Sequence, residues 1–209
     1  MRKPPAQSLD SNEFSRVEAP SQAARTALRE SGPPSSTAKP QRGAIDSLVQ
    51  ASLVELFQAY GIALAPIPKS IRDRPPPLPD VSAMIGFSTD ARRPGRLTLS
   101  LPSAVLGLMK GDVQGFRQGD WARELTNQLM GRIKNRMLQF SVRLQAGLPS
   151  NVESKLLESQ LQGAGPTSFY MGRTLRGEVV VTLEGMPHES ELTYVGTGRI
   201  PSEGETILF

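Results

Sequence analysis

The sequence predicts an α+β domain, in which a largely antiparallel sheet carries two long helices packed on one side, preceded by a disordered N-terminal tail. Three observations predict this fold. Two long segments repeat apolar residues every three or four positions, which is typical of amphipathic helices. Several shorter segments alternate apolar and polar residues, which is typical of strands with one buried face. Short turns join most of these strands, and strands joined by hairpins pair antiparallel.

The first 43 of the 209 residues have the composition of a disordered tail. They contain six Pro and few large apolar residues, so they cannot bury enough apolar surface to offset the entropy lost on ordering. We therefore divide the chain into a tail, 1–43, and a folded domain, 44–209. The tail carries seven basic and four acidic residues, which is +3 of the net charge of +4. We interpret it as a solvated linker, with a docking or nucleic-acid arm as the alternative. We do not expect nucleic acid as a partner. The tail has only three net positive charges and no interleaved aromatics, which is weaker than the basic surface of a typical nucleic-acid-binding protein.

The folded domain opens with a predicted helix that ends at Gly61. Its apolar stripe consists of Ile45, Leu48, Val49, Leu53, Leu56, Phe57 and Tyr60. A Pro-rich loop over 66–79 follows, and we expect it to run extended along the surface. Residues 81–87 and 97–101 alternate on either side of a turn, which predicts a β-hairpin. A short helix is predicted over 103–110.

The longest helix is predicted over 120–144, and its core stripe consists of Trp121, Leu125, Leu129, Ile133, Met137 and Phe140. Arg136 falls among these apolar positions, so we expect the helix to bend near its end or the Arg136 side chain to snorkel. The polar stretch 150–160 receives no assignment. The end of the domain is predicted to form three strands, over 167–171, 177–184 and 191–196.

Composition excludes several kinds of site. The chain has no Cys, which excludes disulfides, thiol nucleophiles and thiolate metal ligands. Its one His, His188, lies in a predicted turn and is interpreted as a solvated loop residue. No apolar run approaches the ~20 residues that cross a bilayer, and the N-terminus has no apolar signal region. We expect a cytoplasmic protein that does not associate with membranes.

The face of the longest helix opposite its core stripe carries Asp120, Glu124, Asn127, Gly131 and Lys134. We call this face the ridge. One interpretation is a solvated surface, with Asp120 as the helix N-cap. The other is a pair of functional groups, Glu124 and Asn127, aimed at a partner. Inside a helix, Asn is a few tenths of a kcal/mol worse than Ala, and Gly is about 1 kcal/mol worse. Placing both on one exposed face is consistent with close approach by another protein.

A carboxylate and a carboxamide one helical turn apart cannot catalyse hydrolysis alone, because they provide neither a nucleophile nor a metal cage. A carboxamide can, however, hold a water in line with a labile phosphoryl group, as Gln does in GTPases. A carboxylate can bind a Lys of the protein that carries the phosphoryl group. Such a site would be shared between two proteins, and the partner would supply the metal and the phosphorylated residue.

The segment from Asp120 to Gly131, DWARELTNQLMG, followed by Pro149, resembles the signature of the CheC/CheX-type chemotaxis phosphatases. That signature has Asp or Ser, then Glu four residues later, Asn three further on, and Pro about one helix later. The first helix, the hairpin over 83–101 and the closing strands also look like their counterparts in the family. The resemblance covers roughly 44–195, and the tail has no counterpart.

This resemblance implies a protein phosphatase that hydrolyses the aspartyl phosphate of a response regulator in two-component signalling, of which chemotaxis is one case. Asn127 would position the attacking water, and Glu124 would bind the regulator's active-site Lys. The other ridge residues, Asp120, Gly131 and Lys134, would contact the partner. The protein would need no cofactor of its own, because Mg²⁺ would come with the phosphorylated regulator.

The two-site branch of the family carries a second Glu-x-x-Asn on a pseudo-symmetric first helix, where this chain has Glu55 and Gln58. The single-site, CheX-like branch therefore fits better, and it implies a homodimer whose sheets join edge to edge. The alternative to an enzyme is a non-catalytic binding or adaptor module of the same fold.

Overall fold

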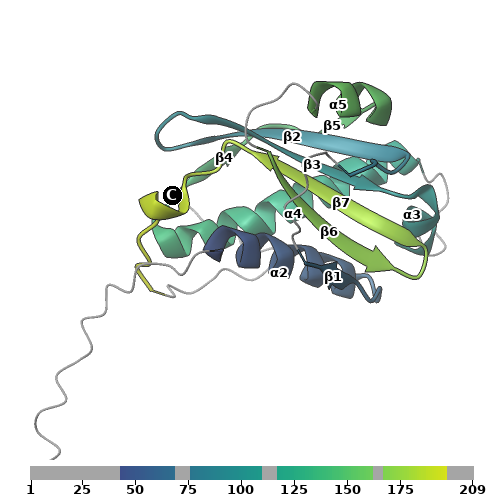
Figure 1. The fold of residues 1–209 in the computed structure, drawn as a ribbon, viewed down its shortest axis with the longest axis horizontal. Coiled ribbons are helices and arrows are strands. Elements are labelled where there is room, and N and C mark those ends of the chain that lie inside the picture. Colours follow the sequence, from purple (N-terminus) through teal and green to yellow (C-terminus); the bar gives the residue numbers. More distant parts are fainter. Residues whose placement is uncertain (1–42, 69–75, 110–116, 162–166, 197–209) are drawn as a thin grey trace, which may run out of the picture. The chain divides into compact units, whose positions relative to one another are not determined.

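The computed structural model describes residues 43–68, 76–109, 117–161 and 167–196. Apart from Gly43, the predicted tail lies outside these residues, as does the middle of the Pro-rich loop. The described residues form a seven-stranded antiparallel sheet and four α-helices (Figure 1). The predicted fold class is therefore confirmed.

The helices and strands have the following bounds. The helices are α2 (Ala44–Ala59), α3 (Ser103–Met109), α4 (Gln118–Met137) and α5 (Ser154–Leu161), with the 3-10 turns η1 (Leu138–Phe140) and η2 (Glu189–Glu191). The strands are β1 (Ala65–Ile67), β2 (Val81–Thr89), β3 (Pro94–Leu101), β4 (Leu144–Ala146), β5 (Ser150–Val152), β6 (Ser168–Thr174) and β7 (Gly177–Glu184).

The sheet is built from two hairpins. The strand order is β1-β6-β7-β3-β2-β4, and β5 also pairs with β2. The predicted hairpin is β2 and β3, in which Ile85 lies opposite Leu97. The second hairpin is β6 and β7, and β7 joins the two hairpins by pairing with β3. On the other side of β2, β4 pairs with its end and β5 with its beginning, so these two strands form one edge of the sheet and β1 forms the other.

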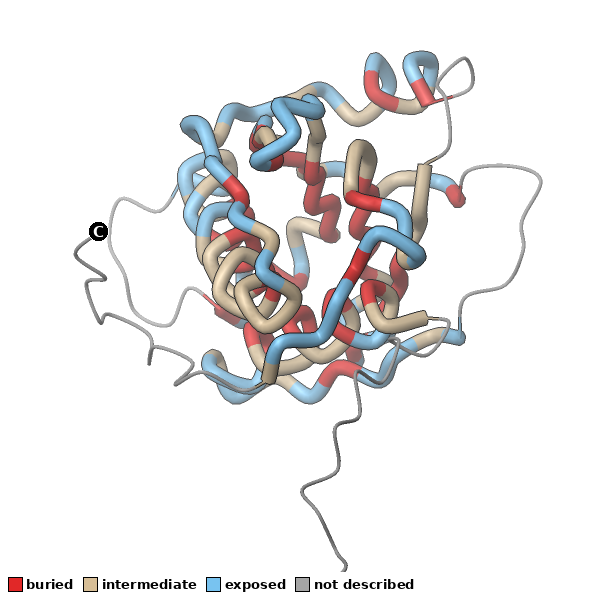
Figure 2. The backbone as a smooth tube through the Cα atoms, turned by 90° about the vertical axis from the view of Figure 1, so that its left-hand side faces the viewer, coloured by how far each residue is buried: buried red, intermediate tan, exposed pale blue. Residues whose placement is uncertain are grey.

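Both long helices pack against one face of this sheet. α2 and α4 lie side by side along it (Figure 1). Because strand side chains alternate, every second residue of the strands points into the layer between helices and sheet. The largest fully buried side chains of the core are Tyr170, Phe57, Leu53, Leu56, Ile85, Leu97, Leu99, Leu101, Leu106, Leu125, Leu129 and Met130. Figure 2 shows that the buried residues gather between the helices and the strands.

The opposite face of the sheet is more polar. Ser82 of β2 lies on it, and its hydroxyl is 2.7 Å from the hydroxyl of Ser100 in β3 and 2.9 Å from that of Ser154 in α5. α5 lies on this side of the sheet (Figure 1) and buries Leu157 and Leu161. The polar stretch that received no assignment thus contains β5 and a helix.

The longest helix is shorter than predicted. α4 begins at Gln118, two residues early, and ends at Met137, where the tighter η1 turn takes over. Ser141 then adopts a left-handed conformation with φ 56°, which ends the helical path before residue 144. Arg136 does snorkel as expected, because its guanidinium group leaves the core stripe and pairs with Glu55 of α2.

The strand predicted over 191–196 is wrong. The η2 turn is followed by an extended segment that pairs with no strand among the described residues. Leu192 is buried, the ring of Tyr194 packs edge-on against Phe140 at 5.8 Å, and the Val195 amide donates to the Gln139 carbonyl. This segment therefore packs on the η1 turn that follows α4 instead of forming a strand. The structure also adds β1, which the sequence analysis missed at the start of the Pro-rich loop.

Candidate functional site

All five predicted site residues lie on α4. Asp120, Glu124 and Asn127 are exposed, and Gly131 and Lys134 are half-buried, while Leu125 and Leu129 point into the core. Asn127 follows Glu124 by three positions of the helix, which places them about 4.5 Å apart along the axis and on neighbouring positions of one face. The structure thus brings the five predicted residues together on one surface.

Asp120 is not the N-cap that the sequence predicted. The cap position is Arg117, which provides no side-chain hydrogen bond, and Asp120 is the third residue of the helix. Its carboxylate accepts a hydrogen bond from Arg123 at 2.7 Å and forms an ion pair with it. A carboxylate in the first turn interacts favourably with the helix dipole, so Asp120 contributes to the start of α4 by charge instead of by capping.

Glu124 is held by neutral side chains. Its carboxylate accepts a hydrogen bond from Nε2 of Gln128 at 2.9 Å, one turn further along α4. Oε1 of Gln128 in turn accepts one from the hydroxyl of Tyr60 at 3.1 Å, from the end of α2. Glu124 forms no ion pair within the part of the chain that the structure describes, whereas Asp120 does. Of the two acids on the ridge, Glu124 is therefore the one whose charge remains available to a cation.

Tyr60 and Gln128 belong to this group as well, although neither was predicted as a site residue. Gln128 follows Glu124 by four residues, and side chains at that spacing are neighbours on a helix. The contact between Gln128 and Glu124 could therefore have been predicted from the sequence. Tyr60 was assigned to the core stripe of its helix. Only the packing of α2 against α4 brings its hydroxyl to Gln128.

Asn127 and Gly131 leave the ridge open. The Asn127 side chain makes no hydrogen bond to any other described residue, so its amide points to solvent. A Cβ added to Gly131 would meet no atom within 4 Å. No packing within the described chain therefore requires glycine at this position, and the ridge keeps a low profile there.

The first helix presents a different surface. Glu55 and Gln58 of α2 are the counterparts of Glu124 and Asn127, and Gln58 is exposed. Glu55, however, is paired with Arg136, and Arg132 lies 3.9 Å from the same carboxylate. The charge of Glu55 is thus neutralised within the domain, so this pair does not repeat the arrangement of the ridge.

Comparison with known proteins gives structural matches alone. No protein-family model matches the chain, and no curated protein matches its sequence. The solved structure of CheX from Desulfovibrio desulfuricans covers 66% of this chain and 97% of its own, with 20% identity and a TM-score of 0.54. A CheC-like superfamily protein from a Shewanella species covers 67% and 96%, with 16% identity and a TM-score of 0.54. CheX from Vibrio vulnificus covers 68% and 95%, with 17% identity and a TM-score of 0.52.

This chain has the CheC/CheX fold. The resemblance inferred from the residues of α4 and the hairpin is therefore confirmed at the level of the fold. These matches cover almost the full length of the known structures. They cover about two thirds of this chain, so about a third of it lies outside the match.

The CheX-like domain also contains a cavity, at the opposite end of α2 from Tyr60. Its volume is about 520 Å³, and Asp46, Tyr170, His188 and Arg93 contribute to its polar lining. Tyr170 is buried and donates a hydrogen bond to Asp46 at 2.8 Å; burial, reinforced by the charge of Asp46, raises the pKa of the Tyr170 hydroxyl. Tyr60 follows Asp46 by fourteen positions along α2, which is about 21 Å, so this cavity is remote from the ridge.

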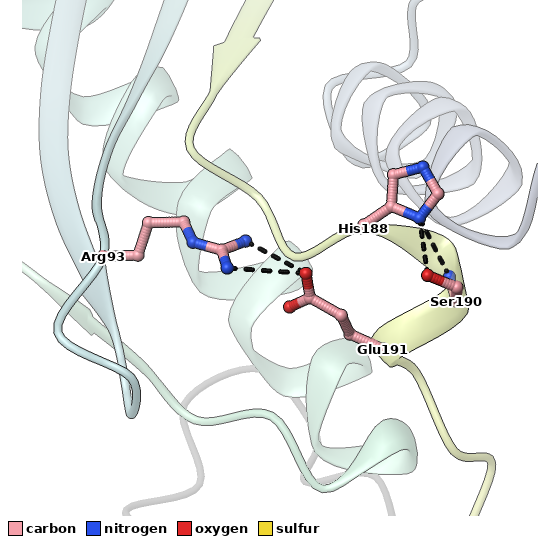
Figure 3. A network of polar contacts seen from close by, with 4 residues as sticks. All are labelled: Arg93, His188, Ser190 and Glu191. Carbon is pink, nitrogen blue, oxygen red and sulfur yellow. Dashed lines mark hydrogen bonds and ion pairs between the residues drawn. The ribbon is translucent and has the colours of Figure 1, made fainter.

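A small polar network borders this cavity (Figure 3). Arg93 of the β2–β3 turn pairs with Glu191 at 3.4 Å. His188 is exposed, and its Nδ1 accepts from the Ser190 amide and lies 2.7 Å from the Ser190 hydroxyl, which caps the η2 turn. His188 therefore has a local structural role, and no acid contacts it in the network drawn.

Within the described ranges, no three His, Asp or Glu side chains gather as a possible metal site. That Mg²⁺ comes with a partner stays a prediction. In the same ranges, no helix combines the length and the apolar character needed to cross a bilayer.

Proposed function

We propose that this protein is a phosphatase of phosphorylated response regulators that acts through the ridge of α4. The observation that carries the proposal is the pair of exposed side chains Glu124 and Asn127, one turn apart on the helix of a CheX-like fold. Among the described residues, no cation pairs with Glu124 and no group bonds to the Asn127 amide, while Gly131 leaves room for another backbone. These three features form a docking surface for a protein that brings its own reactive group.

The proposed reaction is hydrolysis of an acyl phosphate in the complex. The Asn127 carboxamide holds one water in line with the bond between phosphorus and the aspartyl oxygen of the regulator. The water oxygen bonds to phosphorus, the phosphorus–oxygen bond to the aspartate breaks, and the aspartate leaves as a carboxylate. The proton of the water passes to the released phosphate or to solvent. Mg²⁺ bound by the regulator offsets the charge on the phosphoryl oxygens, and Glu124 binds the regulator's Lys.

The test is the decay of aspartyl phosphate on purified response regulators of the host, with substoichiometric amounts of this protein. We expect faster decay of one regulator. Asn127→Ala should lower the accelerated rate by about 30- to 1000-fold, which corresponds to about 2–4 kcal/mol for a lost positioning group. Regulator binding should stay within about twofold, because binding rests on Glu124. The matched control is Asn135→Ala, two turns further along α4. Full activity of Asn127→Ala would disprove this mechanism.

A second candidate is a binding or adaptor module of the same fold that forms the complex without turnover. One observation favours it: no described side chain holds the Asn127 amide, so nothing in the described part of the domain fixes this amide in place to position a water. This candidate predicts a regulator complex, formed without faster decay, that tolerates both Glu124→Ala and Asn127→Ala. The phosphate-decay measurement on wild-type protein, run beside a binding measurement, separates the two candidates.

We further propose that the protein acts in the cytoplasm as a homodimer, with regulators of two-component signalling as its substrates. The strands β4 and β5 form a sheet edge on which a second copy can add its own edge strand. The opposite edge is the three-residue β1, whose central residue, Pro66, has no amide hydrogen to donate.

A further inference from the structure

The side chains of Tyr60, Gln128 and Glu124 form a hydrogen-bonded chain that leads from α2 to the ridge. Tyr60 is the first residue after α2, and its ring packs edge-on against Trp121 of α4, with the ring centroids 5.9 Å apart. This contact places the Tyr60 hydroxyl 3.1 Å from Oε1 of Gln128. The start of the chain is thus set by the packing of two helices instead of by flexible surface groups.

The direction of this chain follows from the charge of Glu124. An amide has a donor end and an acceptor end, and a carboxylate only accepts. Gln128 must therefore turn its Nε2 to Glu124, 2.9 Å away, which leaves its Oε1 to accept from the Tyr60 hydroxyl. The reversed amide would place its oxygen against the carboxylate. Only this orientation of the Gln128 amide therefore allows both hydrogen bonds, to Glu124 and from Tyr60, to form.

We propose that Tyr60 and Gln128 are positioning residues that hold the Glu124 carboxylate ready for a cationic group of the docking partner. The proposal rests on the proposed docking role of Glu124. Gln128 occupies Oε1 of Glu124 with a neutral donor, so the negative charge is kept and the second oxygen remains for the partner. A long exposed side chain that is ordered before binding loses less conformational freedom in the complex, which strengthens binding without altering the chemistry at Asn127.

The first test is Tyr60→Phe, which removes the hydroxyl and keeps the ring on Trp121. We expect KM for the phosphorylated regulator, and the Kd of the complex, to rise about three- to tenfold while kcat stays within about twofold. The matched control is Tyr194→Phe, because Tyr194 also packs edge-on against an aromatic ring, and no described residue bonds to its hydroxyl. A fall in kcat equal to the rise in KM would overturn the proposal.

The second test is a double-mutant cycle. If Tyr60 acts through Glu124, Tyr60→Phe should change nothing further in a Glu124→Ala background. Gln128→Ala should behave as Tyr60→Phe does, with an effect at least as large, and the two changes together should not add. Equal effects of Tyr60→Phe with and without Glu124 would assign Tyr60 a purely structural role and would overturn the proposal.

The third test needs no regulator. The side-chain amide signals of Gln128 in the NMR spectrum of the protein alone should shift in Tyr60→Phe and in Glu124→Ala, and stay in place in Tyr194→Phe. Unmoved signals would show that the chain of hydrogen bonds does not form, whatever the activity. Shifted signals in a protein that neither binds nor dephosphorylates any regulator would refute the proposed function instead, and with it the docking role of Glu124.

Discussion

Arg136 of α4 forms an ion pair with Glu55 of α2, and Arg132 approaches the same carboxylate to 3.9 Å. The Arg136 side chain is one that helical periodicity placed in the core. By leaving the core it ties the two long helices together on their solvent side. It also neutralises Glu55, the acid of α2 that corresponds to Glu124, so the charge of Glu55 is balanced within the domain.

This pairing predicts that a second site cannot be built by replacing Gln58 with the asparagine of the pattern. Gln58→Asn completes a Glu-x-x-Asn pattern on α2, yet Glu55 remains paired with its two arginines. We expect the double variant Gln58→Asn, Asn127→Ala to release phosphate from the regulator at the spontaneous rate. Phosphate release above that rate would mean that Glu55 can exchange its arginine partners for a Lys of the regulator.

Substitution of Gly131 by Ala should change stability and regulator binding in opposite directions. A methyl group on Gly131 meets no atom within 4 Å, so Gly131→Ala should raise the free energy of unfolding by about 0.5–1 kcal/mol through helix propensity. The same methyl group lies on the ridge and should weaken regulator binding. Urea unfolding and a binding titration measure the two effects.

The matched control for Gly131 is Gly107→Ala in α3, where an added Cβ also meets nothing within 4 Å. We expect a comparable gain in stability there, with unchanged regulator binding. If both glycine variants bind the regulator as the wild type does, the ridge near Gly131 is not part of the interface.

The buried pair of Tyr170 and Asp46 predicts an alkaline loss of stability. Burial raises the pKa of Tyr170 in the folded state, so the unfolded chain loses this proton first as the pH rises. The contribution is complete below the ordinary tyrosine pKa of about 10 and is lost as the pH rises through the folded-state pKa. Tyr170→Phe should reduce stability by about 1 kcal/mol at neutral pH and should flatten this alkaline decline.

Chemical unfolding of Tyr170→Phe and wild type at a series of pH values measures this effect. The control is Tyr194→Phe, which removes an exposed hydroxyl and should keep the wild-type decline. Parallel stability profiles for wild type and Tyr170→Phe would argue against ionisation of Tyr170 as the cause.

The expected homodimer can be tested on two leucines that are almost wholly exposed. Leu148 is 91% exposed and lies between β4 and β5 at the open edge of the sheet, while Leu175 is 98% exposed in the β6–β7 turn. If sheets join at this edge, Leu148→Glu places like charges in the interface and should shift the protein toward monomer. Leu175→Glu should leave the dimer intact.

Light scattering after size exclusion measures the mass of both variants. Neither leucine is buried within one copy of the domain, so both variants should fold, and under conditions where the wild type is monomeric they should unfold within about 0.5 kcal/mol of it. A dimer that survives Leu148→Glu would place the interface elsewhere.

Several features of this protein were determined by the sequence alone. Local periodicity predicted the apolar stripes of α2 and α4, because apolar residues recur every three or four positions in a helix. It also predicted the two hairpins, β2–β3 and β6–β7, because apolar residues recur every second position in a strand. The exposed positions of Glu124 and Asn127 follow from the same arithmetic, since the residues that alternate with them, such as Leu125 and Leu129, must be buried. Periodicity therefore predicted which face of α4 is open.

The tertiary structure alone decided what periodicity cannot encode. The residues around Tyr194 pack on the η1 turn after α4 instead of forming a strand, because a half-buried extended segment can be covered by a helical turn as well as paired in a sheet. Arg136 is at a core position of its helix, yet its guanidinium group leaves the core because it pairs with the nearby Glu55. The Tyr60 hydroxyl reaches Glu124 through Gln128 only because α2 ends beside α4. Contacts between residues far apart in the chain depend on how the elements pack, and no local pattern of residues specifies that packing.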